Sequence, residues 1–164
     1  MKISAHGLAL DPPDGWDARI RIADDSGPTG VQAHAVPSDT RTFSAFPVLH
    51  AADFPLPEQR GDFGSSAVEL MRPTNAFIAL IEYHPDSVRT ALFASAGMTR
   101  QVSVDAFSPQ RLQRTLKGQA GWQRFFVEKG RAFCLYVVLG SYANRITIVK
   151  RVNETLTRIE VEAS

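Results

Sequence analysis

The sequence of 164 residues contains a single cysteine, Cys134, and no long uninterrupted hydrophobic segment. One cysteine excludes an intramolecular disulfide, and its place in the apolar run 133–139 predicts a small buried thiol in a reducing compartment. The first residues show no signal-peptide pattern, and no segment is apolar enough over sufficient length to cross a membrane. We therefore expect a cytoplasmic protein without a membrane span.

The sequence also lacks the motifs that identify common catalytic and metal sites. It contains no HExxH motif, no paired Cys/His spacing and no GxSxG nucleophile elbow. The glycine-rich loop 61–66 has no Lys-Ser or Lys-Thr, so it does not match a phosphate-binding loop, and we interpret it first as a structural turn. Arg60, Asp62 and Phe63 make the same loop a candidate binding loop. We expect no cofactor.

Length and composition predict one globular domain over residues 1–164. Hydrophobic residues make up 44% of the chain, which is enough for a substantial core. The net charge of +1 makes nucleic acid a less favoured partner. The charge is unevenly distributed, because residues 1–97 hold 7 basic and 12 acidic side chains, whereas residues 98–158 hold 11 basic and 3 acidic ones. The two parts of the chain therefore differ in the sign of their charge.

Alternation of apolar and polar residues predicts strands in the N-terminal part of the chain. We expect one strand over residues 3–10 and another over 16–22, with a turn between them. Residues 24–42 are rich in Asp, Ser, Gly and Pro and predict a loop. Pro47 confines the apolar segment 43–52 to a sheet edge or a bulge.

The middle of the chain predicts two more strands and two helices. Residues 66–71 and 75–83 are strand-like, and the second segment is apolar enough to be a central strand that is covered on both faces. A proline at the first helical position predicts a helix over 85–97 and a short one over 109–118.

The C-terminal part gives the clearest patterns. Residues 122–128 and 131–142 flank Lys129-Gly130 and predict a β-hairpin. Apolar residues then recur at intervals of three and four from 146 to 159, which predicts an amphipathic helix.

Both ends of the chain resemble PsbP-like domains. A strand, a Pro-Asp-Gly-Trp turn at 13–16 and a second strand are similar to the opening of these domains. The hydrophobic strand 133–139 and the terminal helix 146–159 are similar to their end. The resemblance implies the α+β class, with a mostly antiparallel β-sheet flanked by helices in an α/β/α sandwich. It implies no shared active site, since the known members are mostly binding or assembly factors.

A basic and aromatic segment, 111–131, is the best candidate binding surface. Interleaved arginines and aromatic rings can stack on bases, neutralise phosphates or contact an acidic protein face. Strand periodicity alone predicts the same interleaving, so an ordinary hairpin with its arginines outward is the alternative. The candidate residues are Arg111, Arg114, Lys117, Trp122, Arg124 and Arg131.

Histidines with carboxylates nearby raise the hypothesis of a metal site at His50, Asp53, His84 and Asp86. A metal needs three or four donors that converge on one point. Histidines in loops and at strand ends are more often polar surface residues, so we expect no metal.

Three functions are consistent with the sequence. The leading hypothesis is a non-enzymatic protein-binding or assembly factor with an unidentified protein partner, and a homodimer is also open. The second is a small-ligand or lipid carrier in which the apolar strands 77–81 and 133–139 line a cavity. The third is a small metal-dependent enzyme built around the four histidine and aspartate residues.

Overall fold

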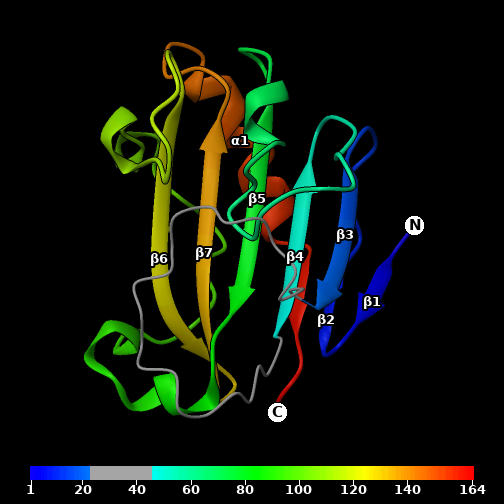
Figure 1. The fold of residues 1–164 in the computed structure, drawn as a ribbon, viewed down its shortest axis with the longest axis vertical. Helices are drawn as coiled ribbons and strands as arrows, with labels where there is room; N and C mark the ends of the chain where they lie inside the picture. Colours follow the sequence, from blue (N-terminus) through cyan, green and yellow to red (C-terminus); the bar gives the residue numbers. More distant parts are fainter. Residues whose placement is uncertain (23–45) are drawn as a thin grey trace.

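The computed structural model describes residues 1–22 and 46–164, which form two antiparallel β-sheets and one α-helix. The larger sheet has the strand order β3-β4-β5-β7-β6, and the smaller sheet has the order β1-β2-β8. Figure 1 shows the larger sheet face on, with the helix α1 (Arg145–Leu156) behind it. The strands are β1 (Ile3–Ala5), β2 (Leu8–Leu10), β3 (Asp17–Ile22), β4 (Pro47–Ala52), β5 (Ala76–Glu82), β6 (Ala120–Glu128), β7 (Arg131–Leu139) and β8 (Ile159–Val161).

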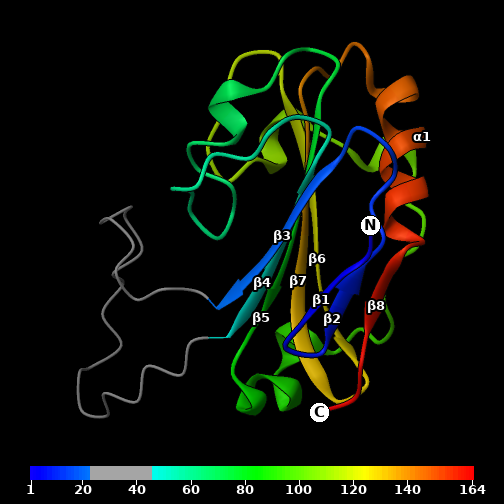
Figure 2. The same cartoon turned by 90° about the vertical axis from the view of Figure 1, so that its right-hand side faces the viewer.

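The two faces of the larger sheet are covered differently. On one face lie α1 and the smaller sheet, as Figure 2 shows from the side. The opposite face is covered, among the described residues, by loops and short 3-10 helices. The expected mostly antiparallel sheet with a C-terminal helix is therefore confirmed, whereas the helix-flanked sandwich is wrong. No helix in the described part of the chain is long and apolar enough to span a membrane.

The second layer of helices is missing because the predicted helices are too short. Residues 85–97 form only the 3-10 helices η2 (Pro85–Arg89) and η3 (Ala91–Phe93), separated by Thr90 in an extended conformation. Residues 109–118 form only η5 (Pro109–Arg111), which ends at an extended Leu112. Proline and a polar cap start each helix, but no apolar stripe follows that would be long enough to propagate it.

Alternating side chains of the central strands build two hydrophobic clusters, one on each face. Ile78 and Leu80 of β5 pack toward α1 and the smaller sheet, whereas Phe77 and Ala79 pack under the loops. All nine residues of β7 are buried. The prediction of a central strand covered on both faces is thus confirmed for β5.

The N-terminal strand is not continuous. His6 and Gly7 have φ values of 53° and 74°, so they form a two-residue turn that pairs Ala5 with Leu8 and splits the expected strand 3–10 into β1 and β2. Two consecutive positive φ values match the right-handed twist of a hairpin. The second expected strand, 16–22, is present as β3.

Pro47 is the first residue of β4, where its missing N–H interrupts no ladder. β4 lies between β3 and β5 and pairs with both in unbroken register, so the prediction of a sheet edge or a bulge is wrong. The strand expected over 66–71 is also wrong, because this segment forms turns and the 3-10 helix η1 (Val68–Leu70). The loop predicted over 24–42, and residues 43–45 of the predicted strand, lie outside the described residues.

The C-terminal elements follow the sequence closely. Lys129 and Gly130 have φ values of 50° and 79° and connect β6 to β7 in the expected hairpin. The helix ends earlier than expected, at Leu156, because Ile159 begins β8 and pairs with Leu10 of β2. This pairing brings the two ends of the chain into one sheet.

Candidate functional site

His50 is the most deeply buried titratable group of the predicted set. It lies in the middle of β4 with no exposed surface, under the loop 57–66. Its Nδ1 accepts a hydrogen bond from Arg60 Nε at 2.7 Å, and its Nε2 lies 2.7 Å from the carbonyl oxygen of Asp62. Because arginine can only donate, Nδ1 carries no proton and Nε2–H donates to Asp62. Both imidazole nitrogens are therefore engaged by one loop.

The surroundings of His50 keep the ring neutral. Burial lowers the pKa of His50 to about 3, and the positive charges of Arg60 and Arg21 act in the same direction. Burial also raises the pKa of Asp62, against the opposing effect of Arg21. Arg21 NH2 donates to the carbonyl oxygen of Arg60 at 2.5 Å and lies 3.5 Å from Asp62 Oδ1.

This network holds the candidate binding loop against the sheet. The Arg60 guanidinium donates inward to His50 and to Pro57 O at 2.8 Å. Phe63 packs edge-on against Tyr136, with the ring centroids 5.6 Å apart. The loop therefore uses its chemically active groups to bind its own sheet, as a structural turn does.

The four residues of the predicted metal site do not converge. Asp53 lies at one end of the sheet, where Oδ1 accepts from Asn75 Nδ2 at 3.0 Å and Oδ2 lies 2.9 Å from Arg151 NH1. His84 and Asp86 lie beyond the opposite end of β5, with 3.4 Å between Nδ1 and Oδ2. Residues 1–22 and 46–164 contain no cluster of three histidine, cysteine or acidic side chains that could bind a metal.

Three of the six candidate residues in the basic and aromatic segment 111–131 make internal contacts. Trp122 is 9% exposed and belongs to the core beside α1. Arg131 is 7% exposed and forms an ion pair with Glu82. Arg124 is half-buried, stacks over Phe126 and donates to backbone carbonyls of the neighbouring loop. These side chains stabilise the fold rather than form an open basic face.

The other three candidates are exposed. Arg111 lines an open groove of about 520 Å³ beside β6, together with Leu112 and three glutamines. Arg114 pairs with Glu69 of η1, and Lys117 lies in the connection that leads into β6.

A second open groove, of about 260 Å³, lies between β1 and β3. Neither groove is lined by the strands 77–81 and 133–139 that were expected to surround a carrier cavity.

A surface that the sequence did not predict lies at the end of the molecule where α1 begins. Ile146 is 72% exposed, Tyr142 is 39% exposed and Leu70 of η1 is 59% exposed. Tyr142 N donates to Gly118 O at 2.7 Å, which places this residue beside the connection that carries Lys117. Figure 1 shows the connections into β5 and β6 and the one from β7 to α1 gathered at this end.

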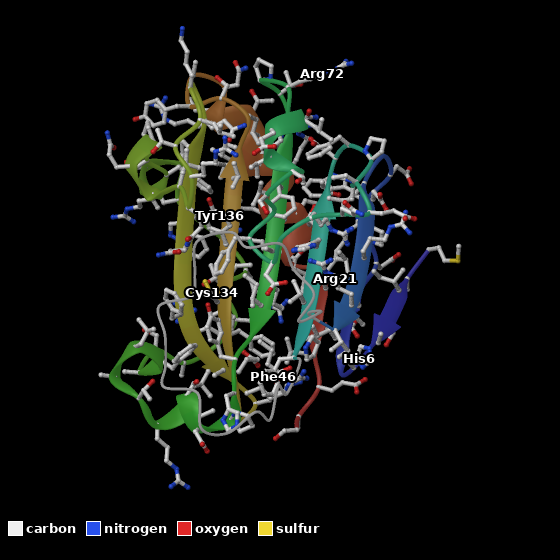
Figure 3. All side chains as sticks on the ribbon, viewed as in Figure 1. His6, Arg21, Phe46, Arg72, Cys134 and Tyr136 are labelled. Atoms are coloured by element: carbon white, nitrogen blue, oxygen red, sulfur yellow. The ribbon has the colours of Figure 1, made fainter. Side chains whose placement is uncertain are left out.

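The same end has more basic than acidic side chains. Asn144 Nδ2 donates to Pro73 O at 3.1 Å, so the segment with Arg72 lies beside the first turn of α1. Figure 3 shows Arg72 at this end with its side chain directed away from the sheet. We define the α1 end surface by Arg72, Lys117, Tyr142, Arg145 and Ile146 at this end, together with Lys150 further along α1; Arg145 is half-buried and the others are exposed. Leu70 lies at the same end but in η1, which packs on the opposite face of the sheet.

The sequence pattern did not predict this surface, because the repeat of apolar residues placed Ile146 on the buried face of the helix. The buried residues of α1 are instead Ile148, Val149, Val152, Thr155 and Leu156. Ile146 lies one residue after the helix start, and the helix turns it away from the sheet. Only Lys117 of the predicted basic residues belongs to the α1 end surface.

No family model matches the chain, and neither the curated proteins nor the solved structures give a match to it.

Proposed function

We propose that this protein is a non-enzymatic binding or assembly factor that holds a protein partner through the α1 end surface. The observation that carries the proposal is the exposure of Ile146 and of Tyr142, four residues before it, among basic side chains. Burying one such aliphatic side chain against a partner would contribute about 1.5–3 kcal/mol. Clustered exposed apolar side chains with a polar rim are typical of protein interaction surfaces.

The non-enzymatic part of the proposal is supported by the state of the candidate catalytic groups. His50 is sealed and neutral, with both nitrogens bonded to the loop above it. Burial raises the pKa of Cys134 to about 12, so its thiolate is not populated near neutral pH. Nucleophilic or acid–base chemistry would require at least one such group to be accessible and suitably ionised.

The test compares partner capture by the intact protein and by an Ile146→Asp variant. The matched control is Leu92→Asp, because Leu92, which is 59% exposed, is an exposed aliphatic residue like Ile146 and lies in η3 at the opposite end of the sheet. Neither variant should change the free energy of unfolding by more than about 0.5 kcal/mol, since both side chains are exposed.

We expect proteins of the source cell to be retained by the wild type and by Leu92→Asp, and to be lost with Ile146→Asp. Cross-linking followed by mass spectrometry identifies them and maps the contact. A wild-type protein that stays monomeric and retains nothing, or a partner that binds all three proteins equally, would contradict the proposal.

A further inference from the structure

Four basic side chains at the α1 end have no acidic counterpart in the described chain. The ion pairs found within residues 1–22 and 46–164 do not involve Arg72, Lys117, Arg145 or Lys150. Three acidic residues around these side chains are already paired: Glu69 with Arg114, Asp53 with Arg151, and Glu154, which follows Lys150 by four residues, with Arg158. The end therefore carries a net positive charge that its own residues leave uncompensated.

Arg145 is held in a fixed position at the start of α1 by its contacts with Tyr142. Its guanidinium carbon lies 4.1 Å from the centroid of the Tyr142 ring, and NH1 donates to Tyr142 O at 3.0 Å. A guanidinium that is stacked on a ring loses less side-chain entropy when it binds a carboxylate. Because Nε of Arg145 is buried, an external carboxylate can bind only the terminal nitrogens, of which Nη1 already donates to Tyr142 O.

The first turn of α1 also favours negative charge from outside. It contains no acidic residue, and the N-cap residue Asn144 makes no capping hydrogen bond through its side chain. The positive end of the helix dipole adds to the field of the basic side chains. Lys150 lies four residues after Ile146, so the two share one helix face and place a charge beside an apolar contact.

We infer that the partner presents an acidic amphipathic segment to this surface. Its apolar side chains contact Ile146 and Tyr142, and its carboxylates pair with Arg72, Arg145 and Lys150. The inference rests on the proposed function and specifies the chemistry of the partner.

A protein carboxylate fits this surface better than nucleic acid or a membrane. Single-stranded nucleic acid is bound by several open aromatic platforms, whereas this surface has one aromatic ring, Tyr142, with Arg145 stacked on one of its faces. Stable membrane contact needs a large inserted apolar face, whereas Tyr142 and Ile146 are only two side chains. The net charge of +1 for the whole chain gives no general attraction to either polyanion.

The experiment selects binders to the intact protein from a phage-displayed library of random 16-residue peptides. The inference predicts enrichment of peptides that combine Asp or Glu with Leu, Phe or Ile. The strongest binder is then synthesised and titrated against the wild type and the variants.

The double variant Arg145→Gln/Lys150→Gln should bind the selected peptide about tenfold more weakly, because two charge-assisted contacts are lost. The matched control is Arg89→Gln/Lys129→Gln, which removes the same charge from exposed positions at the opposite end and should bind as the wild type does. The wild-type affinity should also fall with added salt, and this dependence should weaken in the Arg145/Lys150 variant.

The other outcomes separate this inference from the proposed function. Apolar peptides without acidic enrichment that are still lost with Ile146→Asp would overturn the inference and leave the proposed function standing. Peptides unaffected by any α1 end variant, or no selected binder at all, would overturn both. Tighter binding of polyuridylate or of phosphatidylserine vesicles at the same residues would assign the surface to nucleic acid or to membrane and overturn the inference.

Discussion

Arg131 and Glu82 form a bidentate ion pair between the neighbouring strands β7 and β5, and Arg131 also binds the smaller sheet. Arg131 Nε donates to Glu82 Oε1 at 2.9 Å, and NH2 donates to Oε2 at 2.6 Å, with the side chains only 7% and 12% exposed. Arg131 NH1 also donates to Gly7 O and Glu162 O, each at 3.0 Å. One side chain of β7 thus binds the β1–β2 turn and the residue that follows β8.

We expect Arg131→Ala to lower the free energy of unfolding by about 3–5 kcal/mol, because it leaves Glu82 buried without a counterion. Urea denaturation followed by circular dichroism measures the change. The control is Arg114→Ala, whose ion pair with Glu69 is exposed and should contribute about 0–1 kcal/mol. Equal effects of the two variants would mean that the buried contacts of Arg131 with Glu82 and with the smaller sheet stabilise the fold no more than an exposed ion pair does.

Because His50 is buried and neutral, we expect the free energy of unfolding to decrease as the pH is lowered. His50 has its ordinary pKa of 6.5 in the unfolded chain, whereas its pKa in the folded protein is about 3. The unfolded state therefore binds the extra proton between these values, and the free energy of unfolding drops by about 1.4 kcal/mol per pH unit as the pH falls from about 6 toward 4. Above pH 7 this contribution is constant.

A His50→Gln variant removes the titrating ring and should flatten the pH dependence over this range in urea denaturation. Asp62 opposes this loss of stability near the lower limit of the pH range. Its pKa is raised in the folded protein, so the folded state binds a proton at Asp62 at a higher pH than the unfolded state does. A wild-type slope that persists unchanged in His50→Gln would assign the acid sensitivity to other groups.

Gly64 allows close contact between the loop and the sheet. It has φ of 82°, and a Cβ there would lie 2.4 Å from Phe77 Cε1. Gly15 has φ of 83° but no atom within 4 Å of its Cβ position. We expect Gly15→Ala to cost about 1 kcal/mol from backbone strain, and Gly64→Ala to cost a further 1–3 kcal/mol or so from overpacking. Thermal unfolding of both variants gives the difference, and equal losses would contradict the predicted clash with Phe77.

Cys134 should be inert in the folded protein. It lies on β7 with no exposed surface, on the same face as Tyr136 (Figure 3), and burial raises its pKa to about 12. We expect a thiol reagent at pH 8 to label Cys134 only as fast as the protein opens, and immediately in denaturing urea. Rapid labelling of the folded protein would show that this face opens locally.

Short-range patterns predicted the elements that are specified by a local turn or by the local pattern of apolar residues. The Lys129-Gly130 turn, the apolar strand β5 and the repeat of apolar residues in α1 each depend on local backbone geometry or on one periodicity. The two predicted helices over 85–97 and 109–118 did not form, because a proline and a cap can start a helix but cannot supply a surface for it to pack against.

The chemistry of the individual side chains depended on segments far apart in the chain. His50 is neutral because the loop 57–66 folds over β4, and Arg131 is buried because Gly7, 124 residues away, lies beside it. Ile146 is exposed because the sheet meets α1 on another side. The sequence by itself therefore determined the hairpin β6–β7, the central strand β5 and the helix α1. Only the tertiary structure decided which basic and apolar side chains remain at the surface, since burial depends on contacts that no local pattern encodes.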